Sequence, residues 1–267
     1  LAWWGDICIK PEMEEVKAID PKNGKEKVLF TLKQMNEALE AAGIKPVYAL
    51  YALSYPWGDK TEVQLPQAQQ YAVYNWKTHT VTTRNDFPKK AFGNVDLQPV
   101  SGNMAYTIAN NVYVNGVQVT DEPEGVLCGQ SVHRNEFGID RGIFMSPDKT
   151  RFAFYRMDQT MVTDYPQVNT FERSATYAPD SYPMAGMKSH KVTIGIYTIA
   201  SGKTTWLDLG NVTDRYFTNI TWSPDSKEIY MFEVNRNQTD VKLDVYDATT
   251  GEKEKTLYTE HSDKYVE

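Results

Sequence analysis

The chain has 267 residues, of which 41% are hydrophobic and 12% aromatic, so it can bury a sizeable core. The formal net charge is −7 and Lys and Arg do not cluster, which argues against a protein that binds nucleic acid or an anionic membrane surface. No apolar run is long enough to span a membrane, and Cys8 and Cys128 are too few for a disulfide framework or a structural zinc site.

The amino terminus reads as a strand that has already begun. Leu1-Ala2-Trp3-Trp4 has none of the sections of a signal peptide, and Tyr265-Val266-Glu267 ends without a closing signal. We therefore expect the sequence to be a fragment, with any signal peptide upstream.

One short helix is expected near the amino terminus. Apolar residues recur at intervals of three and four from Leu32 to Ala42, the spacing of an amphipathic helix. Thr31 is the expected N-cap and Gly43 the expected stop.

A nine-residue pattern that passes from a polar turn into a strand occurs three times. Its prolines, Pro99, Pro147 and Pro224, are 48 and then 77 residues apart. Repeats at this spacing are typical of propellers and solenoids.

A second recurring pattern places a glycine five positions after an aromatic or aliphatic strand residue. The pairs are Ile19 with Gly24, Tyr197 with Gly202 and Tyr246 with Gly251, while Tyr74 has His79 in the glycine position and Asn115-Gly116 is a shorter version. Five such hairpins along the chain predict an all-β fold, a β-propeller with about five four-stranded blades and one short inserted helix.

The segment from Gln159 to Lys191 departs from this regularity. It is polar, and Pro166, Pro179 and Pro183 interrupt it. Loops of this length in a compact domain are usually functional or disordered.

The chain contains no complete catalytic or metal-binding motif. Gly129-Gln130-Ser131-Val132-His133 lacks the last glycine of a nucleophile elbow, and there is no HExxH motif or glycine-rich phosphate loop. We expect no metal and no cofactor. His133 is more typical of a hydrogen-bonded loop histidine than of a ligand, and His79, His190 and His261 of turn or surface residues.

Glu136 is the strongest candidate for a functional residue. It lies in a glycine-containing loop just before a strand, where a carboxylate can be presented to a cationic group. Spacing alone favours the alternative, a solvated turn glutamate or one paired with Arg134 or Arg141. Arg156 and Asp158 are likewise expected to form an internal ion pair.

Three stretches resemble a known family: SVHRNEFGIDRGIFMSPDKTRFAFYRMDQTMVTDYP, SYPMAGMKSHKVTIGIYTIASGKT and NITWSPDSKEIYMFEVNRNQ. They resemble the amino-terminal propeller of dipeptidyl peptidase IV-like serine exopeptidases of the prolyl oligopeptidase superfamily, especially the bacterial prolyl tripeptidyl peptidase branch. The resemblance implies an eight-bladed propeller followed by an α/β-hydrolase domain with a Ser-Asp-His triad. Residues 1–267 would then be a partial propeller that holds about five blades and none of the catalytic residues. Such a chain should not hydrolyse peptide bonds alone.

The resemblance also implies a substrate-binding site. A propeller glutamate of the family binds the free α-amino group of the substrate, and Glu136 is the matching residue, with Asn135, Arg134 and Arg156 as further substrate-binding candidates. Dipeptidyl peptidases carry two adjacent glutamates here, whereas this sequence has one. The arginine that some relatives supply has no counterpart between Gln64 and Gln70. Release of two or of three residues therefore stays open.

The full-length protein is expected to be a periplasmic, secreted or cell-surface enzyme that releases di- or tripeptides after proline and forms a homodimer. Its expected partners are peptides with a free amino terminus and a proline near it, and the missing hydrolase domain. The propeller would restrict access to the active site. The competing hypothesis is a non-catalytic propeller that serves as a protein-binding scaffold, with Gln159 to Lys191 as its contact loop.

Overall fold

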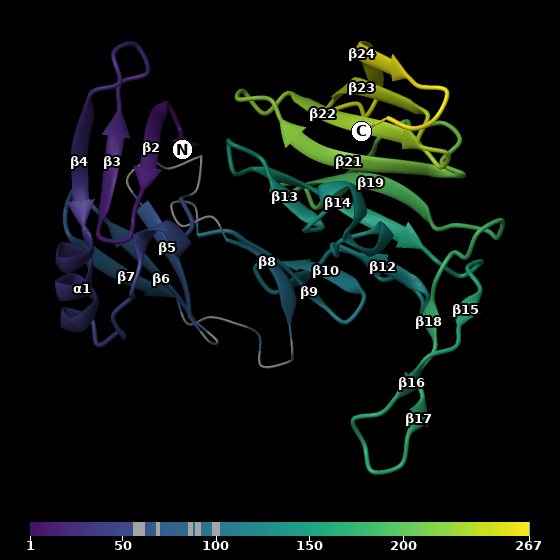
Figure 1. Cartoon of the computed structure of the whole chain (residues 1–267), viewed down its shortest axis with the longest axis horizontal. Coiled ribbons are helices and arrows are strands. Elements are labelled where there is room, and N and C mark those ends of the chain that lie inside the picture. Colours follow the sequence, from purple (N-terminus) through teal and green to yellow (C-terminus); the bar gives the residue numbers. More distant parts are fainter. Residues whose placement is uncertain (56–61, 68–69, 85–87, 89–91, 98–101, 267) are drawn as a thin grey trace. The chain divides into compact units, whose positions relative to one another are not determined.

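The computed structural model describes residues 1–55, 62–67, 70–84, 88, 92–97 and 102–266. These residues form five antiparallel sheets of three to five strands that follow one another along the chain, two smaller two-stranded sheets and one α-helix (Figure 1). The chain divides into two compact units, Leu1–Lys89 with Gln98–Gly102, and Lys90–Leu97 with Asn103–Glu267. The number of these sheets agrees with the predicted number of blades, and the all-β prediction is confirmed.

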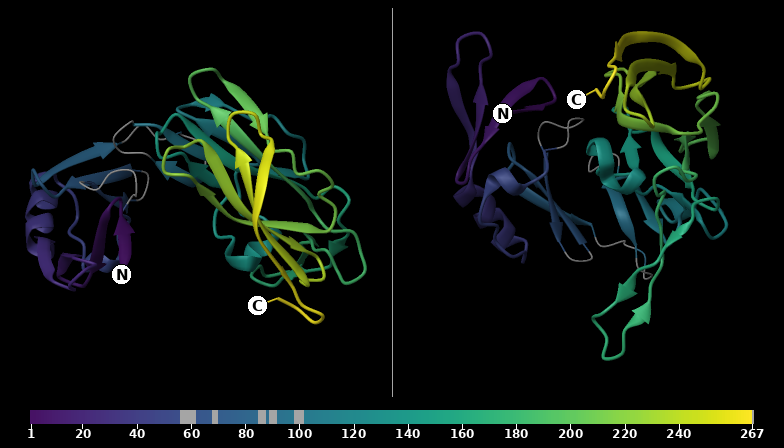
Figure 2. Two further views of the ribbon diagram at one scale, coloured as in Figure 1. Left: turned by 90° about the horizontal axis from the view of Figure 1, so that it is seen from above. Right: turned by 45° about the vertical axis from the view of Figure 1, so that its right-hand side comes forward.

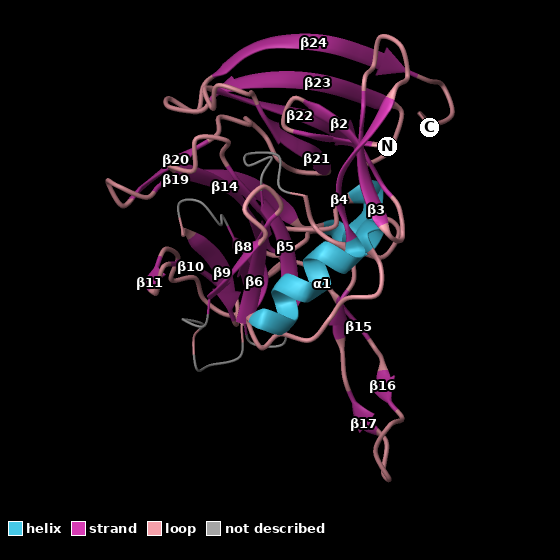
Figure 3. Cartoon of the chain, turned by 90° about the vertical axis from the view of Figure 1, so that its left-hand side faces the viewer, coloured by secondary structure: helices cyan, strands magenta, loops and turns pink. Residues whose placement is uncertain are grey.

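The first unit contains two sheets and the helix. The first sheet has the order β1 (Ala2–Trp4), β2 (Ile7–Pro11), β3 (Glu15–Ile19), β4 (Glu26–Thr31), and the second has the order β5 (Glu62–Gln67), β6 (Gln70–Asn75), β7 (Thr80–Arg84). The helix α1 (Leu32–Ala41) directly follows β4 (Figure 3). Side chains from the helix and both sheets share one buried cluster that includes Trp4, Phe30, Leu39 and Tyr74.

The helix begins and ends as the sequence predicts. Thr31 Oγ1 accepts a hydrogen bond from the Gln34 backbone N–H at 3.3 Å, and the Gln34 side chain accepts one from the Thr31 N–H at 2.9 Å. This reciprocal pair is a capping box, which satisfies amide groups at the start of a helix. Met35 and Leu39 are buried, and Gly43 has the left-handed φ of 72° that ends a helix.

The second unit contains the other three sheets. The third has the order β11 (Val117–Gln118), β10 (Asn111–Val114), β9 (Met104–Ile108), β8 (Gly93–Leu97). In the fourth, β12 (Val126–Cys128) and β13 (Ile143–Met145) both pair with β14 (Arg151–Asp158), which is followed by β19 (Lys191–Thr198) and β20 (Lys203–Trp206). The fifth has the order β21 (Arg215–Trp222), β22 (Glu228–Asn235), β23 (Asp240–Asp247), β24 (Lys253–His261).

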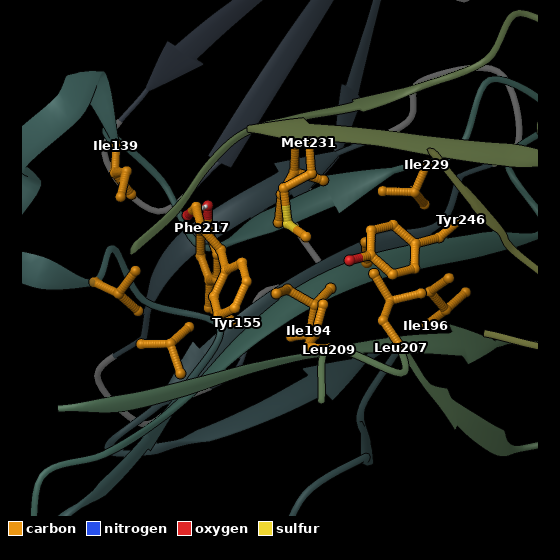
Figure 4. Close-up of a cluster of buried hydrophobic side chains, with 14 of the residues drawn as sticks. Ile139, Tyr155, Ile194, Ile196, Leu207, Leu209, Phe217, Ile229, Met231 and Tyr246 are labelled. Carbon is orange, nitrogen blue, oxygen red and sulfur yellow. Dashed lines mark hydrogen bonds between the residues drawn. The ribbon is translucent and has the colours of Figure 1, made fainter. Parts of the chain in front are cut away.

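The largest core of this unit lies between the fourth and fifth sheets. Figure 4 shows Ile194 and Ile196 of β19 facing Ile229 and Met231 of β22, and all four are almost completely buried. Branched and aromatic side chains on facing sheets interdigitate in this way because burial removes their apolar surface from water. This core fixes the position of the loops at the ends of both sheets.

The proline repeat forms the turn between β13 and β14 in the fourth sheet and between β21 and β22 in the fifth. In the fourth sheet the Ser146 hydroxyl donates to Asp148 at 2.6 Å and accepts from the Arg151 N–H at 3.0 Å. Ser223 accepts from the Glu228 N–H at 2.9 Å in the equivalent turn of the fifth sheet. The first copy of the repeat begins in residues 98–101, outside the described part of the chain.

The glycine repeat is a turn that comes later in the sheet. Gly24, Gly202 and Gly251 have φ values of 72°, 67° and 79°, each in the turn before the last strand of its sheet. His79 takes the same left-handed conformation, with φ of 53°, between β6 and β7. Its Nδ1 lies 2.7 Å from the Tyr74 hydroxyl, so a side-chain hydrogen bond supports the strained position. The hairpin prediction is confirmed.

Residues 159–190, named the arm here, form an insertion between β14 and β19. Two short ladders run along it, in which β15 (Asp164–Tyr165) pairs with β18 (Asp180–Ser181) and β16 (Val168–Asn169) pairs with β17 (Thr176–Tyr177). The arm projects away from the sheets of its unit in Figures 1, 2 and 3. The long polar segment that departs from the repeats is therefore a two-stranded extension.

Candidate functional site

The turn His133–Gly138, which contains Glu136, has an unusual backbone. His133, Arg134, Asn135 and Phe137 all have positive φ, between 49° and 63°, whereas Glu136 is extended, with φ of −69° and ψ of 162°. Non-glycine residues seldom adopt positive φ, and such strain tends to occur where a side chain must be placed for function. The turn therefore presents Glu136 in a conformation different from that of its neighbours.

Contacts from the fifth sheet hold this turn in place. The Thr218 hydroxyl, on β21, donates to the Phe137 carbonyl at 2.8 Å. The Phe137 ring lies against the Tyr216 ring, with centroids 4.8 Å apart. A further hydrogen bond joins the residues that flank the turn, since the Ser131 hydroxyl donates to the Ile139 carbonyl at 2.8 Å.

Glu136 lines a polar cleft of about 150 Å³, named the Glu136 cleft here. The turn, the carboxyl-terminal part of the arm and the fifth sheet all contribute to its walls. The lining residues are His133, Arg134, Glu136, Tyr182, Pro183, Ser189, His190, Tyr216 and Arg236.

Three charged side chains line this cleft, and two of them are neutralised by aspartates. Arg134 forms an ion pair with Asp180 of the arm. Arg236 forms one with Asp214 at 2.9 Å. No described residue forms a hydrogen bond or ion pair with the Glu136 carboxylate, which is exposed. Among the described lining residues, Glu136 thus carries the one charge that has no partner.

Two buried histidines also line the same cleft. His133 and His190 are each only 3% exposed, and their ring centroids are 5.8 Å apart. Burial lowers the pKa of His133 to about 3, assisted by the nearby His190, and burial also lowers the pKa of His190. Both imidazoles are therefore neutral near pH 7 and add no charge that competes with Glu136.

The histidine predictions need correction. Neither ring nitrogen of His133 has a hydrogen-bond partner among the described residues, so it is not a hydrogen-bonded loop histidine. His190 is buried rather than a surface residue. The two lie far apart in the sequence, and no spacing rule brings them together. His79 and His261 do occupy a turn and the surface, as expected.

The other predicted substrate-binding residues differ in their surroundings. Asn135 is exposed in the turn, and its backbone N–H donates to the Val132 carbonyl at 3.2 Å. The Arg156 guanidinium binds both oxygens of Glu122, at 2.6 and 2.8 Å, and holds the pKa of that carboxyl below its usual range. Arg156 thus pairs with Glu122 instead of the expected Asp158, and it is not among the residues that line the Glu136 cleft. The segment Gln64 to Gln70 lies partly outside the described residues.

No group of three or more His, Cys, Asp or Glu side chains in the described part of the chain is arranged to hold a metal ion. No helix in it is long and apolar enough to cross a membrane.

A match to a known protein family shows which family the chain is related to. Residues 58–267 match the family model of the dipeptidyl peptidase IV (DPP IV) N-terminal region. The chain belongs to this family. The resemblance expected from the sequence is confirmed, and the five sheets are part of a DPP IV-type amino-terminal propeller.

Individual relatives agree with this membership. A Bacteroides ovatus protein of known crystal structure, assigned as a dipeptidyl aminopeptidase IV, is 49% identical, with a TM-score of 0.76 over 100% of this chain and 38% of its own. A Phaeosphaeria nodorum protein assigned as dipeptidyl-aminopeptidase B is 27% identical over 178 residues, which are 57% of this chain and 20% of that protein. Porphyromonas gingivalis dipeptidyl peptidase 4 shares the fold, with a TM-score of 0.67 and 19% identity over 98% of this chain and 40% of its own. The chain therefore spans two fifths or less of the length of these DPP IV-family relatives.

Proposed function

We propose that this chain is the propeller part of a serine exopeptidase that releases amino-terminal di- or tripeptides after proline, with Glu136 as the residue that binds the free α-amino group. The observation that carries the proposal is the unpaired Glu136 carboxylate in a cleft whose two arginines are both neutralised. A substrate ammonium group supplies the missing positive charge. Charge-assisted hydrogen bonds of this kind are about twice as strong as neutral ones.

This arrangement explains how such an enzyme would select the end of a peptide. An acetylated amino group cannot neutralise Glu136, so binding would desolvate the carboxylate without giving it a partner. A peptide extended beyond the anchor would need space that a cleft of about 150 Å³ does not offer. The distance from Glu136 to the catalytic serine would then fix how many residues are removed.

The proposal assigns the chemical step to a region outside this chain. In it, residues 1–267 form a partial propeller, and an α/β-hydrolase domain with the Ser-Asp-His triad belongs to the longer protein. The length of the relatives supports this division, since the chain covers only 38% of the Bacteroides ovatus protein. The propeller would contribute binding of the amino terminus and restriction of access, without a catalytic residue.

Hydrolysis by the full-length wild-type protein tests this function. Chromogenic Xaa-Pro and Xaa-Xaa-Pro peptides are compared, each with a free and with an acetylated amino terminus. We expect cleavage after proline only with the free amine, with a kcat/KM at least about a hundredfold higher than for the acetylated peptide. The preferred length distinguishes dipeptidyl from tripeptidyl release. Equal cleavage of free and acetylated peptides would contradict the proposal.

The arm favours one alternative, a propeller that acts as a protein-binding scaffold. Its tip exposes apolar side chains, with Phe171 99%, Tyr177 66% and Val168 61% accessible. Exposed apolar surface of this kind is typical of an interaction site. The same peptide panel separates the two functions, because a scaffold cleaves none of the peptides.

A further inference from the structure

We infer that Asp180 keeps the amine-binding site open to substrate by holding Arg134 away from Glu136. This inference rests on the proposed function of Glu136. Without Asp180, the guanidinium of Arg134 would be free to pair with the Glu136 carboxylate, and it would compete with the ammonium group of the substrate.

Arg134 is well placed to act as such a competitor. It precedes Glu136 by two residues in the same turn, and both side chains line one cleft of about 150 Å³. A group attached by a short tether acts at an effective concentration in the millimolar range or above. A guanidinium also binds a carboxylate through two parallel hydrogen bonds, which a single ammonium group cannot match. An unrestrained Arg134 would therefore block the site.

The arm supplies the groups that hold Arg134 elsewhere. Asp180, on β18, forms the ion pair with Arg134, and the Arg134 guanidinium lies 4.9 Å from the centre of the Tyr182 ring. Pairing of Asp180 with Tyr165 across the β15–β18 ladder fixes the backbone of the aspartate. The base of the arm thus acts on the cleft by holding Arg134, and the exposed tip of the arm has no part in this contact.

The second arginine of the cleft provides a matched control. Arg236 donates to Asp214 at 2.9 Å, to the Met187 carbonyl at 2.6 Å and to the Met184 carbonyl at 3.3 Å. Removal of the Asp214 charge leaves two carbonyl acceptors that still hold Arg236. Removal of the Asp180 charge leaves Arg134 with no other ion-pair partner among the described residues. The two aspartate substitutions should therefore differ in effect.

The test measures KM and kcat of the full-length protein for its preferred free-amine peptide, in the variants Asp180→Asn, Arg134→Gln, the double variant and Asp214→Asn. We expect Asp180→Asn to raise KM about tenfold or more with little change in kcat. Asp214→Asn should stay within about threefold of wild type. Arg134→Gln gives the KM of a site that has no competing guanidinium. The double variant should return to the KM of Arg134→Gln, because the competitor is gone.

Several results would overturn the inference. If Asp180→Asn leaves KM unchanged, Asp180 does not protect the site. If the double variant has the same raised KM as Asp180→Asn, the effect does not pass through Arg134 and Asp180 has a structural role alone. A large loss in Arg134→Gln alone, which leaves the arm residues intact, also contradicts it. Thermal unfolding checks that each variant folds, as expected because both side chains are 42% exposed.

Glu136→Gln separates this inference from the proposed function. If Glu136→Gln leaves KM for the free-amine peptide unchanged, the proposed function fails and the inference fails with it. If Glu136→Gln raises KM while Asp180→Asn does not, only the role of Asp180 is overturned.

Discussion

At the scale of single residues, the site is defined by which charges already have partners. Glu136 would be an ordinary surface carboxylate if either arginine of the cleft paired with it. Arg134 and Arg236 are instead neutralised by Asp180 and Asp214. An isolated negative charge beside neutral, buried imidazoles attracts a cation and repels a carboxylate.

The backbone of the turn supports the same interpretation. Four non-glycine residues with positive φ cost of order 1 kcal/mol or more each, and the surrounding contacts must compensate. The Thr218 hydrogen bond and the stacking of Phe137 on Tyr216 provide part of that compensation. We infer that the strain is retained because it sets the direction of Glu136.

The buried His133 predicts loss of stability in acid. Its pKa is about 3 in the folded chain and near the ordinary 6.5 when unfolded. The unfolded chain therefore binds the proton more tightly, so this contribution to stability is complete above pH 6.5 and falls as the pH drops toward 3, by up to about 1.4 kcal/mol per pH unit. The lowered pKa of His190 acts in the same direction.

Urea unfolding of the 267-residue chain between pH 7 and about pH 4.5 checks this dependence. His133→Leu should reduce the slope of unfolding free energy against pH. His261→Asn is the control, since the pKa of this exposed histidine is raised by Asp240 and its contribution has the opposite sign. An identical slope in His133→Leu and wild type would show that His133 does not carry the effect.

At the scale of elements, side-chain bonds to backbone carbonyls join the fourth sheet to the fifth. The buried Tyr155 hydroxyl, on β14, donates to the Phe217 carbonyl at 2.7 Å, and burial raises the pKa of that phenol. In the reverse direction, the Trp222 indole N–H donates to the Phe144 carbonyl at 2.9 Å. Such bonds fix the spacing of the two sheets on which the Glu136 cleft depends.

Removal of one of these bonds should have a measurable cost. Tyr155→Phe keeps the ring and its apolar contacts but deletes the hydroxyl, so we expect a loss of about 1–2 kcal/mol in unfolding free energy. Tyr258→Phe is the control, because that hydroxyl bonds Glu260 on an exposed strand. Urea unfolding measures both, and equal effects would show that the Tyr155 hydroxyl does not stabilise the contact between the sheets.

Helix ends and tight turns could be predicted because the residues that specify them lie close together in the sequence. The N-cap of α1 and the turn glycines act within about six residues, so the sequence alone identifies them. The arm was not predictable in the same way, since each of its four strands has only two residues and shows no period. Pro166 and Pro179 lie at the breaks between its two ladders, where the missing N–H groups interrupt pairing.

At the scale of the whole molecule, the site depends on residues far apart in the chain. The resemblance to the DPP IV family identified Glu136, but nothing in its spacing indicated which arginines would be neutralised. Asp180 comes from the arm, and Asp214 and Arg236 from the fifth sheet and its turns. Only the folded arrangement shows that these groups meet, which is why the pairing of Arg156 with Glu122 was also missed.

In the proposed enzyme, this chain would supply the part that binds the amino terminus of the substrate. It spans 38% of the Bacteroides ovatus relative, and its second unit contains the Glu136 cleft. Its contribution would be recognition of a free amino terminus at a defined place. The central claim therefore concerns Glu136 and can be tested without knowledge of the natural substrate.

The most direct test is the ratio of kcat/KM for a free-amine peptide to that for its acetylated form, measured in the full-length wild-type protein, Glu136→Gln and Asp140→Asn. Asp140 is the matched control, an exposed carboxylate four residues further along the same loop. We expect Glu136→Gln to reduce the ratio by about two orders of magnitude or more and Asp140→Asn to leave it within about threefold. A ratio that survives in Glu136→Gln, or that falls equally in both variants, would contradict the assignment of Glu136 as the residue that binds the amino terminus.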